Sequence, residues 1–594
     1  MVAVSATLLG GGGNRPERYL CGHVFWRADG RNGCVLSQCS KKEAEMQEGF
    51  NLAPHRRPLR RRWLTLAGLL VLVAALVSPA LADAPPPGTP TGNPEDAGVL
   101  APVGTLTVDH ATSANAATRP VIGVPSVKAP FHNRPAIDLA TYKEAKKVIP
   151  GASRPGAPAG PAAPVSLGGF SGITQATAED TWPNDINGAV SHGGFADGYN
   201  VQVVNQHYTA YHKSTAPGAP VCDMSYNTRT GDGADVMFDP RVEYDQYWQR
   251  FVDEVETGGA SQHQFLMISF GRNPCGGYWT YNLGGINGFC PAPLGGAKFW
   301  DYPQISLTQD AVILTANCFE GNIYRGALSF AVAKAKLYNG LGFSVPVQGP
   351  FCGTTTPPRV IDGNPRAHML ARCAGVHNIQ FRNPQADFYG AIASDTVVAG
   401  LAPTVPPSAG QAGCFAMSCT VDTSDGRYIN PPTQYGDDLW AVATWTLGGL
   451  ATPFWHDIDT EGGGADTLKQ SGAVFISGCG ADYMASIGAV PNGTAWVNWS
   501  QSQAPSCGGG TTIRMAAASR LGGDPVNTMP LLGIVFTSPA TLTGNFDPNF
   551  GTQRWGDTSS VSTDPSAGDR AWLWNGFART SSLWGTTSQL VRNP

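Results

Sequence analysis

The chain has 594 residues, a formal net charge of −5 and only 14% charged residues. This length exceeds one ordinary domain, although all-β folds run large. The high content of glycine (73) and proline (47) favours turn-rich β structure over long charged helices. The body of the chain has no basic stripe, which argues against a nucleic-acid partner.

The first segment, residues 1–82, ends in a pattern typical of protein export. Arginines cluster between residues 56 and 62, an apolar run of about 15 residues follows at 63–77, and Ala80-Leu81-Ala82 comes next. The run is short for a membrane span, which needs about 20 residues. We therefore expect an N-terminal extension with a signal peptide, or an uncleaved signal anchor that would be the chain's contact with a membrane. The expected location is secreted, extracellular or in the cell envelope.

Residues 83–167 are rich in proline, alanine and glycine. Such a stretch buries too little apolar surface to offset the entropy lost on ordering, so we expect a disordered linker. Within it, the sequence from Asp138 to Val148 predicts one short helix.

Cysteine usage also indicates export. Of the 13 cysteines, Cys21, Cys34 and Cys39 precede the apolar run, and the others are Cys222, Cys275, Cys290, Cys318, Cys352, Cys373, Cys414, Cys419, Cys479 and Cys507. This even number fits up to five disulfides in an oxidising compartment. Neighbours suggest Cys275–Cys290, Cys352–Cys373, Cys414–Cys419 and Cys479–Cys507, leaving Cys222 with Cys318, but sequence alone leaves the pairing open. The competing interpretation is a metal site, but neither a Cys-x-x-Cys nor a His-x-x-x-His spacing is present to favour it.

From residue 168 onward the chain has the pattern of successive β-hairpins, as at 304–315 and 486–499. An aspartate opens a short strand about every 60 residues, and these openers are Asp185, Asp239, Asp301, Asp362, Asp438, Asp482 and Asp557. A multistrand unit repeated in this way is typical of a β-propeller. We predict an all-β fold over residues 168–594, a seven-bladed β-propeller with six blades as the alternative, behind a disordered N-terminal region. A pair of β-sandwiches is the competing architecture.

Several phrases resemble those of a known family. Pro183–Val190, Asp239–Asp245 and Phe299–Leu307 are similar to its first three blades, Asp438–Ala441 to its fifth and Arg554–Asp557 to its end. Their order over about residues 180–590 resembles the bacterial sialidase-like (BNR-type) β-propeller proteins. The resemblance implies the propeller fold but little about activity, because many such proteins have no assigned reaction. The sialidase box is degenerate at residues 562–568, and no arginine triad for a carboxylate sugar can be assigned.

A propeller brings the starts of its innermost strands around one axis, so the candidate funnel and ligand residues are Asp185, Asp239, Asp301 and Asp557. The favoured alternative is structural: Asp239, Asp301 and Asp557 would cap blade turns by accepting backbone N–H bonds. No cofactor is expected. Ca²⁺ is an alternative, for which Asp232, Asp235 and Asp239 come closest to a linear calcium loop.

The candidate catalytic residues are Glu243, Tyr244, Asp245 and Arg250, which supply the residue types of a sialidase-like site. In a strand, however, Tyr244 faces away from Glu243 and Asp245. The numerous tryptophans are expected to pack between blades, where large aromatics fill the wedge, although exposed ones would make stacking platforms for sugars. They are Trp440, Trp455, Trp496, Trp499, Trp555, Trp572, Trp574 and Trp584.

These features favour an exported propeller that binds a glycan or a cell-envelope component at the funnel mouth and has no assigned reaction. The alternative is an enzyme, a glycoside hydrolase or lyase acting on extracellular polysaccharide. It would need at least two acidic residues converging in the funnel, one with a raised pKa. A third hypothesis makes the propeller a purely structural scaffold.

Overall fold

The computed structural model describes residues 6–10, 18–22, 26–28, 31–33, 102–124, 134–149, 151–155, 163–194, 197–233, 235–258, 262–364, 366–382, 392–411, 419–460, 466–503 and 512–594. The chain divides into two compact units, Met1–Pro85 and Pro86–Pro594. In the first unit, β1 (Ala6–Gly10) pairs with β2 (Arg18–Gly22), and β3 (Trp26–Ala28) pairs with β4 (Arg31–Gly33). The apolar run at 63–77 lies outside the described residues. Within the described residues, every helix is too short or too polar to span a bilayer.

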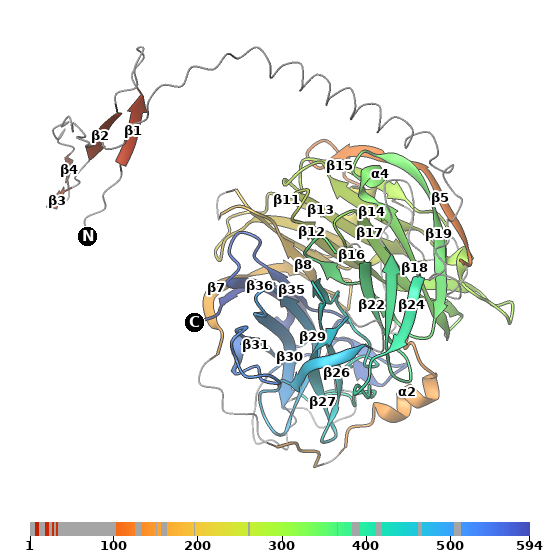
Figure 1. The fold of residues 1–594 in the computed structure, drawn as a ribbon. Coiled ribbons are helices and arrows are strands. Elements are labelled where there is room, and N and C mark those ends of the chain that lie inside the picture. The colour runs from red at the N-terminus through yellow and green to blue at the C-terminus, as the bar shows by residue number, and fades with distance from the viewer. Residues whose placement is uncertain are drawn as a thin grey trace, which may run out of the picture. The chain divides into compact units, whose positions relative to one another are not determined.

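In the second unit, seven sheets follow one another along the chain as the blades of a β-propeller (Figure 1). From the inside outward, blades 1–4 are β8 (Asn187–Val190), β9 (Tyr199–Val204), β10 (His207–His212), β11 (Cys222–Ser225); β12 (Met237–Asp245), β13 (Arg250–Thr257), β14 (Gln264–Ser269), β15 (Gly277–Asn282); β16 (Lys298–Leu307), β17 (Ala311–Glu320), β18 (Ile323–Ala333), β19 (Leu341–Phe351); and β20 (Thr355–Thr356), β22 (Arg366–Arg372), β23 (Val376–Arg382), β24 (Ile392–Val397).

Blades 5–7 are β25 (Thr433–Tyr435), β26 (Asp438–Leu447), β27 (Leu450–Asp459), β28 (Thr467–Ala473); β29 (Gly480–Ala489), β30 (Ala495–Gln503), β31 (Arg514–Arg520), β32 (Leu531–Thr537); and β35 (Ser560–Thr563), β36 (Arg570–Ala578), β37 (Trp584–Arg592), β7 (Val165–Thr174). The short β21 (Arg359–Val360) pairs in parallel with β25, and β33 (Phe546–Asp547) pairs with β34 (Thr552–Gln553). Contacts between inner strands join β8 to β12, β12 to β16, β25 to β29 and β29 to β35, and β35 of blade 7 packs on β8 of blade 1; on the side of blade 4, β16 contacts β21, which pairs with β25. This circle confirms the seven-bladed propeller and the hairpins predicted from the sequence.

The chain before the propeller is ordered over much of its length, which corrects the expectation of a disordered linker at 83–167. β5 (Gly104–His110) adds a fifth strand to blade 3, and β6 (Thr112–Asn115) adds one to blade 2. β5 buries Leu106 and Val108 and exposes Thr105, Thr107 and Asp109. A single alternating strand of this kind is unstable alone, but the open edge of an existing blade supplies its hydrogen bonds.

Residues 134–149 and 151–155 contact the end of the propeller where the inner strands begin; we call residues 134–149 the strap. The strap contains the predicted helix, α2 (Leu139–Ala145), whose Asp138 side chain accepts the N–H of Thr141 as an N-cap. Tyr142 is fully buried and Lys146 is 6% exposed. The composition of this segment did not predict that it is ordered, because its order depends on a few buried polar contacts with the propeller rather than on an apolar face.

The hydrophobic core lies between the blades. All eight tryptophans named from the sequence are buried, as the packing interpretation predicted. Trp440 and Trp455 stack within blade 5, with ring centroids 5.8 Å apart. Burial of one such side chain stabilises the fold by roughly 3 kcal/mol, so the tryptophans are not available as sugar platforms.

Three disulfides link Cys222 to Cys275, Cys290 to Cys318 and Cys352 to Cys373. The Cys352–Cys373 pair confirms the sequence prediction, whereas Cys275–Cys290 and Cys222–Cys318 were wrong. Pairing by sequence proximity failed because adjacent blades bring distant cysteines together. Cys419 is also disulfide-bonded; Cys414 and Cys507 lie outside the described residues. The three bridges fit an oxidising environment.

Candidate functional site

Five of the seven predicted openers lie near the start of an innermost strand: Asp185 and Asp557 two and three residues before it, and Asp239, Asp301 and Asp482 within its first four residues. The other two do not: Asp362 follows β21, and Asp438 begins the second strand of blade 5. The sequence prediction was wrong there because the segment before β25 is irregular and β20 has only two residues.

The openers are also not equivalent in register. Asp185, Asp239, Tyr302 and Met484 share a left-handed backbone, with φ of 44°, 51°, 61° and 53°. Asp239, Tyr302 and Met484 lie within the bulges of β12, β16 and β29. The position in blade 3 that corresponds to Asp239 is therefore Tyr302, one residue after Asp301.

The structure nevertheless brings the four funnel candidates Asp185, Asp239, Asp301 and Asp557 together. Burial, followed by repulsion from Asp557, raises the pKa of Asp185 to about 6. Burial and the charges of Asp185 and Asp301 hold the pKa of Asp239 well above its ordinary value. Carboxyl groups with raised pKa therefore converge at this end of the channel, one property that the glycosidase alternative requires.

Side chains do cap backbone N–H groups near the strand starts, as the capping interpretation predicted. The capping residues, however, are Asp185 and Asn205 rather than Asp239, Asp301 and Asp557. Asp185 accepts the N–H of Asp557 at 2.6 Å, and its other oxygen accepts Asn205 Nδ2 at 2.6 Å. Asn205 in turn accepts the N–H of Asp239 at 2.7 Å. The carboxylate of Asp557 instead binds the guanidinium of Arg554, with both contacts at 3.0 Å. Capping side chains thus come from neighbouring blades, a relationship that sequence spacing does not reveal.

The channel is filled where these aspartates lie. The irregular segment before β25 enters it: the Ile429 carbonyl accepts Arg241 of blade 2 at 3.1 Å, and Asn430 accepts Asn187 of blade 1 at 3.2 Å. The strap lies at the same end, where the N–H of Ala136 donates to Asp425 at 2.7 Å. Asp185 is only 2% exposed, so a sugar cannot reach its carboxyl group without a rearrangement.

The predicted calcium set does not assemble. The carboxylate of Asp239 faces Glu256 and Asp301, whose oxygens lie within 4.8 Å of it and of each other, rather than Asp232 and Asp235. The bulge in β12 turns Asp239 toward blade 3. Ca²⁺ takes six to eight oxygen ligands, and three carboxyl groups, one of them bound to Arg134, do not make a complete set.

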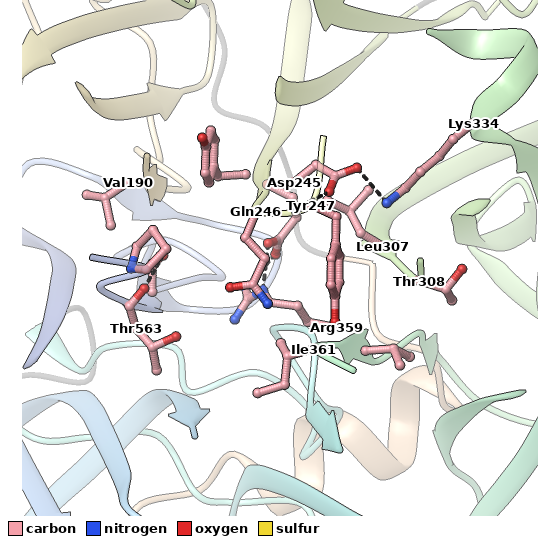
Figure 2. Close-up of a pocket in the computed structure, with 15 residues that line it drawn as sticks. Val190, Asp245, Gln246, Tyr247, Leu307, Thr308, Lys334, Arg359, Ile361 and Thr563 are labelled. Carbon is pink, nitrogen blue, oxygen red and sulfur yellow. Dashed lines mark hydrogen bonds and ion pairs between the residues drawn. The ribbon is translucent and has the colours of Figure 1, made fainter. Parts of the chain in front are cut away.

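A pocket lies at the opposite end of the inner strands, about 20 Å along β12 from Asp239 at roughly 3.3 Å per residue. Its enclosed part has a volume of about 30 Å³, room for one or two water-sized groups. Figure 2 shows Asp245 bonded to Lys334, with Arg359 at the centre and Tyr247 beside it. Glu243, Tyr244 and Asp245, three of the four catalytic candidates, line this pocket.

Asp245 fixes the loop that borders the pocket. One of its oxygens accepts the N–H groups of Tyr247 at 3.0 Å and Trp248 at 3.2 Å. The other forms an ion pair with Lys334 Nζ at 2.5 Å and accepts the Tyr338 hydroxyl at 2.5 Å. Asp245 is 2% exposed, whereas Tyr247 and Trp248 are 43% and 57% exposed. A buried carboxylate thus holds two adjacent aromatic side chains in solvent on a rigid turn.

Glu243 and Arg359 form a bidentate pair, with Nε and Nη2 of the arginine 2.7 and 2.6 Å from the carboxylate oxygens. Nη1 of Arg359 has no partner among the described residues, and the Arg359 side chain is 16% exposed. The pair therefore presents N–H donors and carboxylate lone pairs in a fixed plane at the wall of the pocket.

The four catalytic candidates do not all meet in this pocket. The ring of Tyr244 packs against that of Phe251, with the ring centroids 4.9 Å apart. Arg250 donates to the carbonyl of Ser269 at 3.1 Å and does not line the pocket. Both carboxylates accept bonds from cationic side chains, whereas a glycosidase needs one carboxyl group that carries a proton to the leaving group.

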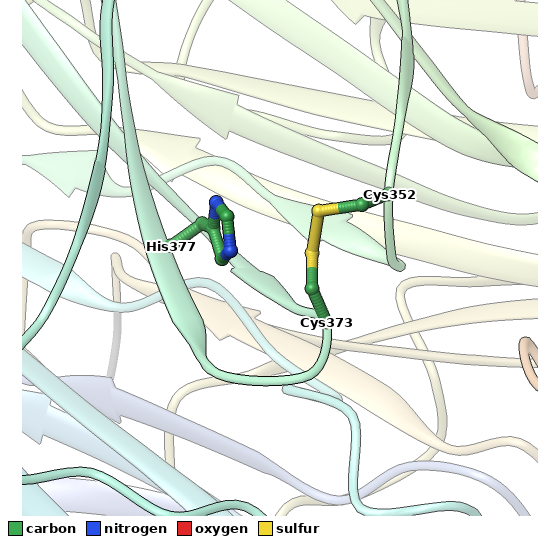
Figure 3. Close-up of side chains that lie close together, drawn as sticks. All are labelled: Cys352, Cys373 and His377. Carbon is green, nitrogen blue, oxygen red and sulfur yellow. A yellow bond between two sulfur atoms is a disulfide. The ribbon is translucent and has the colours of Figure 1, made fainter.

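Cys352, Cys373 and His377 of blade 4 also lie close together (Figure 3). The two sulfurs form a disulfide, so they are not available as thiolate ligands for a metal. Nδ1 of His377 lies 2.8 Å from Asp395 Oδ1. We interpret the group as a structural staple.

Comparisons with known proteins return remote structural matches. The Hadza microbial sialidase Hz136 matches at 9% identity and a TM-score of 0.35, over 69% of this chain and 65% of its own. A protein of unknown function from Dyadobacter fermentans DSM 18053 matches at 9% and 0.34, over 60% and 94% of the two chains. A Synechocystis apocarotenoid oxygenase variant matches at 11% and 0.32, over 59% and 74%. The chain thus spans less than two thirds of that sialidase, and at these TM-scores none of the matches bears on function.

No family model matches the sequence, and no curated protein does. The functional interpretation therefore depends on the residues themselves. Sequence reasoning missed Tyr247 and Trp248. A Tyr-Trp pair between two predicted strands was a usable signal, because side chains at the tip of a hairpin lie outside the core. It also missed the strap residues and Asp422 and Asp425, whose roles depend on contacts across the ring.

Proposed function

We propose that this protein is an exported propeller that binds carbohydrate, and that its sugar site is the pocket lined by Tyr247 together with the adjacent exposed ring of Trp248. The observation that carries the proposal is the rigid turn on which Asp245 presents both aromatic side chains to solvent. Two exposed aromatic rings held in place lose little entropy when a ligand stacks on them. The apolar face of a sugar ring suits such a platform.

The polar wall beside the platform supports the same proposal. A sugar presents hydroxyl groups that both donate and accept, and Glu243 with Arg359 offers acceptors and donors side by side. The enclosed volume of about 30 Å³ admits a single hydroxyl group rather than a ring. A saccharide would therefore lie on Tyr247 and Trp248 and insert one hydroxyl toward Arg359.

A printed array of neutral and acidic oligosaccharides, followed by calorimetry with the best-bound glycan, tests the proposal. Trp248→Ala and Tyr247→Ala should each weaken binding about tenfold, since a stacking ring contributes roughly 1–1.5 kcal/mol. Phe546→Ala is the matched control, because Phe546 is a 38% exposed aromatic in the β33–β34 hairpin and should bind normally. Absence of glycan binding by the wild-type protein, or binding unchanged in both variants, would refute the proposal.

The glycoside hydrolase remains the second candidate, because carboxyl groups with raised pKa converge at the channel. It requires the strap and the segment before β25 to move. A panel of fluorogenic glycosides, sialosides included, tests it directly. Turnover lost in Asp301→Asn would establish an enzyme and displace the binding function.

We further propose that the chain is secreted or held in the cell envelope and is a sialidase-like propeller of the BNR type. The disulfides and the apolar run at 63–77 support export. Mass spectrometry of the mature N-terminus checks cleavage after Ala82.

A further inference from the structure

The strap places one arginine in a groove at the start of blade 3. The groove has a volume of about 730 Å³ and is lined by Arg134, Asn287, Lys298, Phe299 and Asn322, with small residues between them. Ligand pockets have volumes of about 300–1,000 Å³. The groove lies at the opposite end of the inner strands from the Tyr247 pocket and shares no residue with it.

The side chain of Arg134 occupies this groove as a bound ligand would. Its guanidinium carbon lies 4.0 Å from the centroid of the Phe299 ring, within the range of a cation–π contact. Nη1 of Arg134 lies 3.2 Å from Asp301 Oδ2. Phe238 stacks on Phe299 with an interplanar angle of 2°, which fixes the ring against the neighbouring blade. The Arg134 side chain is 27% exposed, so the contact is reachable from solvent.

The three neighbouring carboxyl groups favour a cation at this point, because a cation beside them offsets the repulsion between them. Asp239 and Glu256 lie beside Asp301, with carboxylate oxygens within 4.8 Å of one another. The carboxylate of Asp239 is half-buried and makes no hydrogen bond or ion pair among the described residues. Lys298, the other cation of the groove, donates to the Gly288 carbonyl at 2.7 Å instead. Arg134 is therefore the cation that contacts both the aromatic ring and the carboxylate.

We propose that this groove is a binding site for a guanidinium group and that Arg134 is its tethered occupant, which an external ligand displaces. The ligand's guanidinium would lie on Phe299 and pair with Asp301, as Arg134 does. The strap keeps its other contacts when Arg134 leaves, because Tyr142 donates to Asp422 at 2.6 Å and Lys146 pairs with the same carboxylate at 3.1 Å. A tethered side chain competes at an effective concentration of about millimolar, so the wild-type protein should bind weakly.

The test uses agmatine, a small guanidinium compound, and the peptide Gly-Arg-Gly as probes on the full chain. Calorimetry should show agmatine binding Arg134→Ala at least tenfold more tightly than the wild type. Agmatine should also raise the melting temperature of Arg134→Ala more than that of the wild type. Arg134→Gln serves in the same way if the alanine variant folds poorly. Tight binding of Gly-Arg-Gly would indicate a peptide source of the guanidinium, and binding of agmatine alone a small-molecule source.

Three controls decide the outcome. Lys143→Ala, which removes an exposed cation of the strap outside the groove, should behave as the wild type. Adding Asp301→Asn or Phe299→Leu to Arg134→Ala should reduce agmatine binding about tenfold. Trp248→Ala should leave agmatine binding unchanged. The proposal for this groove and the proposal for the sugar site can therefore be refuted separately. Equal agmatine affinity in the wild type and Arg134→Ala, or affinity retained after Asp301→Asn, would overturn the proposal.

Discussion

Arg154 and Asp482 form an ion pair in which neither side chain has exposed surface. The arginine comes from the chain before the propeller, and the aspartate lies in β29, the innermost strand of blade 6. Asp482 also accepts Trp499 Nε1 at 2.6 Å, and Arg154 donates to the carbonyl groups of Ala451 and Gly480 at 3.1 and 2.7 Å. A segment outside the repeat thus joins blades 5 and 6.

Asp482→Asn should lower the free energy of unfolding by about 3–5 kcal/mol, because removal of one partner leaves the buried guanidinium uncompensated. Equilibrium urea unfolding measures the change. Glu144→Gln is the control, since Glu144 pairs with Lys147 where both side chains are mostly exposed, and it should have little effect. A loss for Asp482→Asn as small as the control's would show that the pair is not formed.

Acid should release the strap from the propeller. Burial disfavours the charged form of Asp422, but Lys146 and Arg554 lower its pKa from 3.8 to about 2. A lowered folded-state pKa contributes stability that is complete above about pH 4 and disappears as the pH falls through about 2. Hydrogen exchange of the α2 amides, measured by mass spectrometry at each pH and corrected for the intrinsic exchange rate, reports strap release. In Asp422→Asn, exchange should already be fast at neutral pH; a pH profile identical to the wild type's would contradict this origin.

The raised pKa of Asp185 predicts the opposite slope. A folded-state pKa of about 6 against 3.8 unfolded means that the folded protein holds this proton more tightly. Its contribution to the unfolding free energy is full below about pH 4 and falls as the pH rises through 6. Urea midpoints between pH 4.5 and 7 should therefore change less in Asp185→Asn than in the wild type.

Gly188 of β8 should not tolerate a methyl group. A Cβ at this position would lie 2.5 Å from the indole of Trp574 in blade 7. Gly188→Ala should therefore cost about 1–3 kcal/mol through overpacking where the ring of blades closes. Gly218→Ala, at a site with open space around it, should unfold at the wild-type temperature in calorimetry. Wild-type stability of both variants would show that blade 7 does not pack on blade 1 as described.

The disulfide between Cys222 and Cys275 should be a large contributor to stability. It encloses a sequence separation of 53 residues, and a loop of this length corresponds to about 4 kcal/mol in the chain-entropy account. Replacing both cysteines with serine should lower the urea midpoint accordingly. Peptide mapping without reduction should recover this pair, and recovery of Cys222 with Cys318 would disprove the pairing.

The sequence by itself determined the architecture. Alternating hairpins, buried tryptophans and repeated aspartates are local patterns, and a repeated unit that cannot bury its faces alone must stack on its neighbours. For the same reason α2 was predictable, since Asp138 caps its own helix.

The tertiary structure decided everything that depends on contacts between blades. It paired Cys222 with Cys275, moved the start of blade 5 away from Asp438, and turned the expected linker into strands and a strap. It also filled the channel, so that Asp185 is a buried cap rather than a ligand-binding residue. The tertiary structure also left Trp248 exposed while it buried the eight tryptophans named from the sequence. The physical reason is that each of these contacts joins residues far apart in the chain, and closure of the ring, rather than any local preference, selects which ones meet.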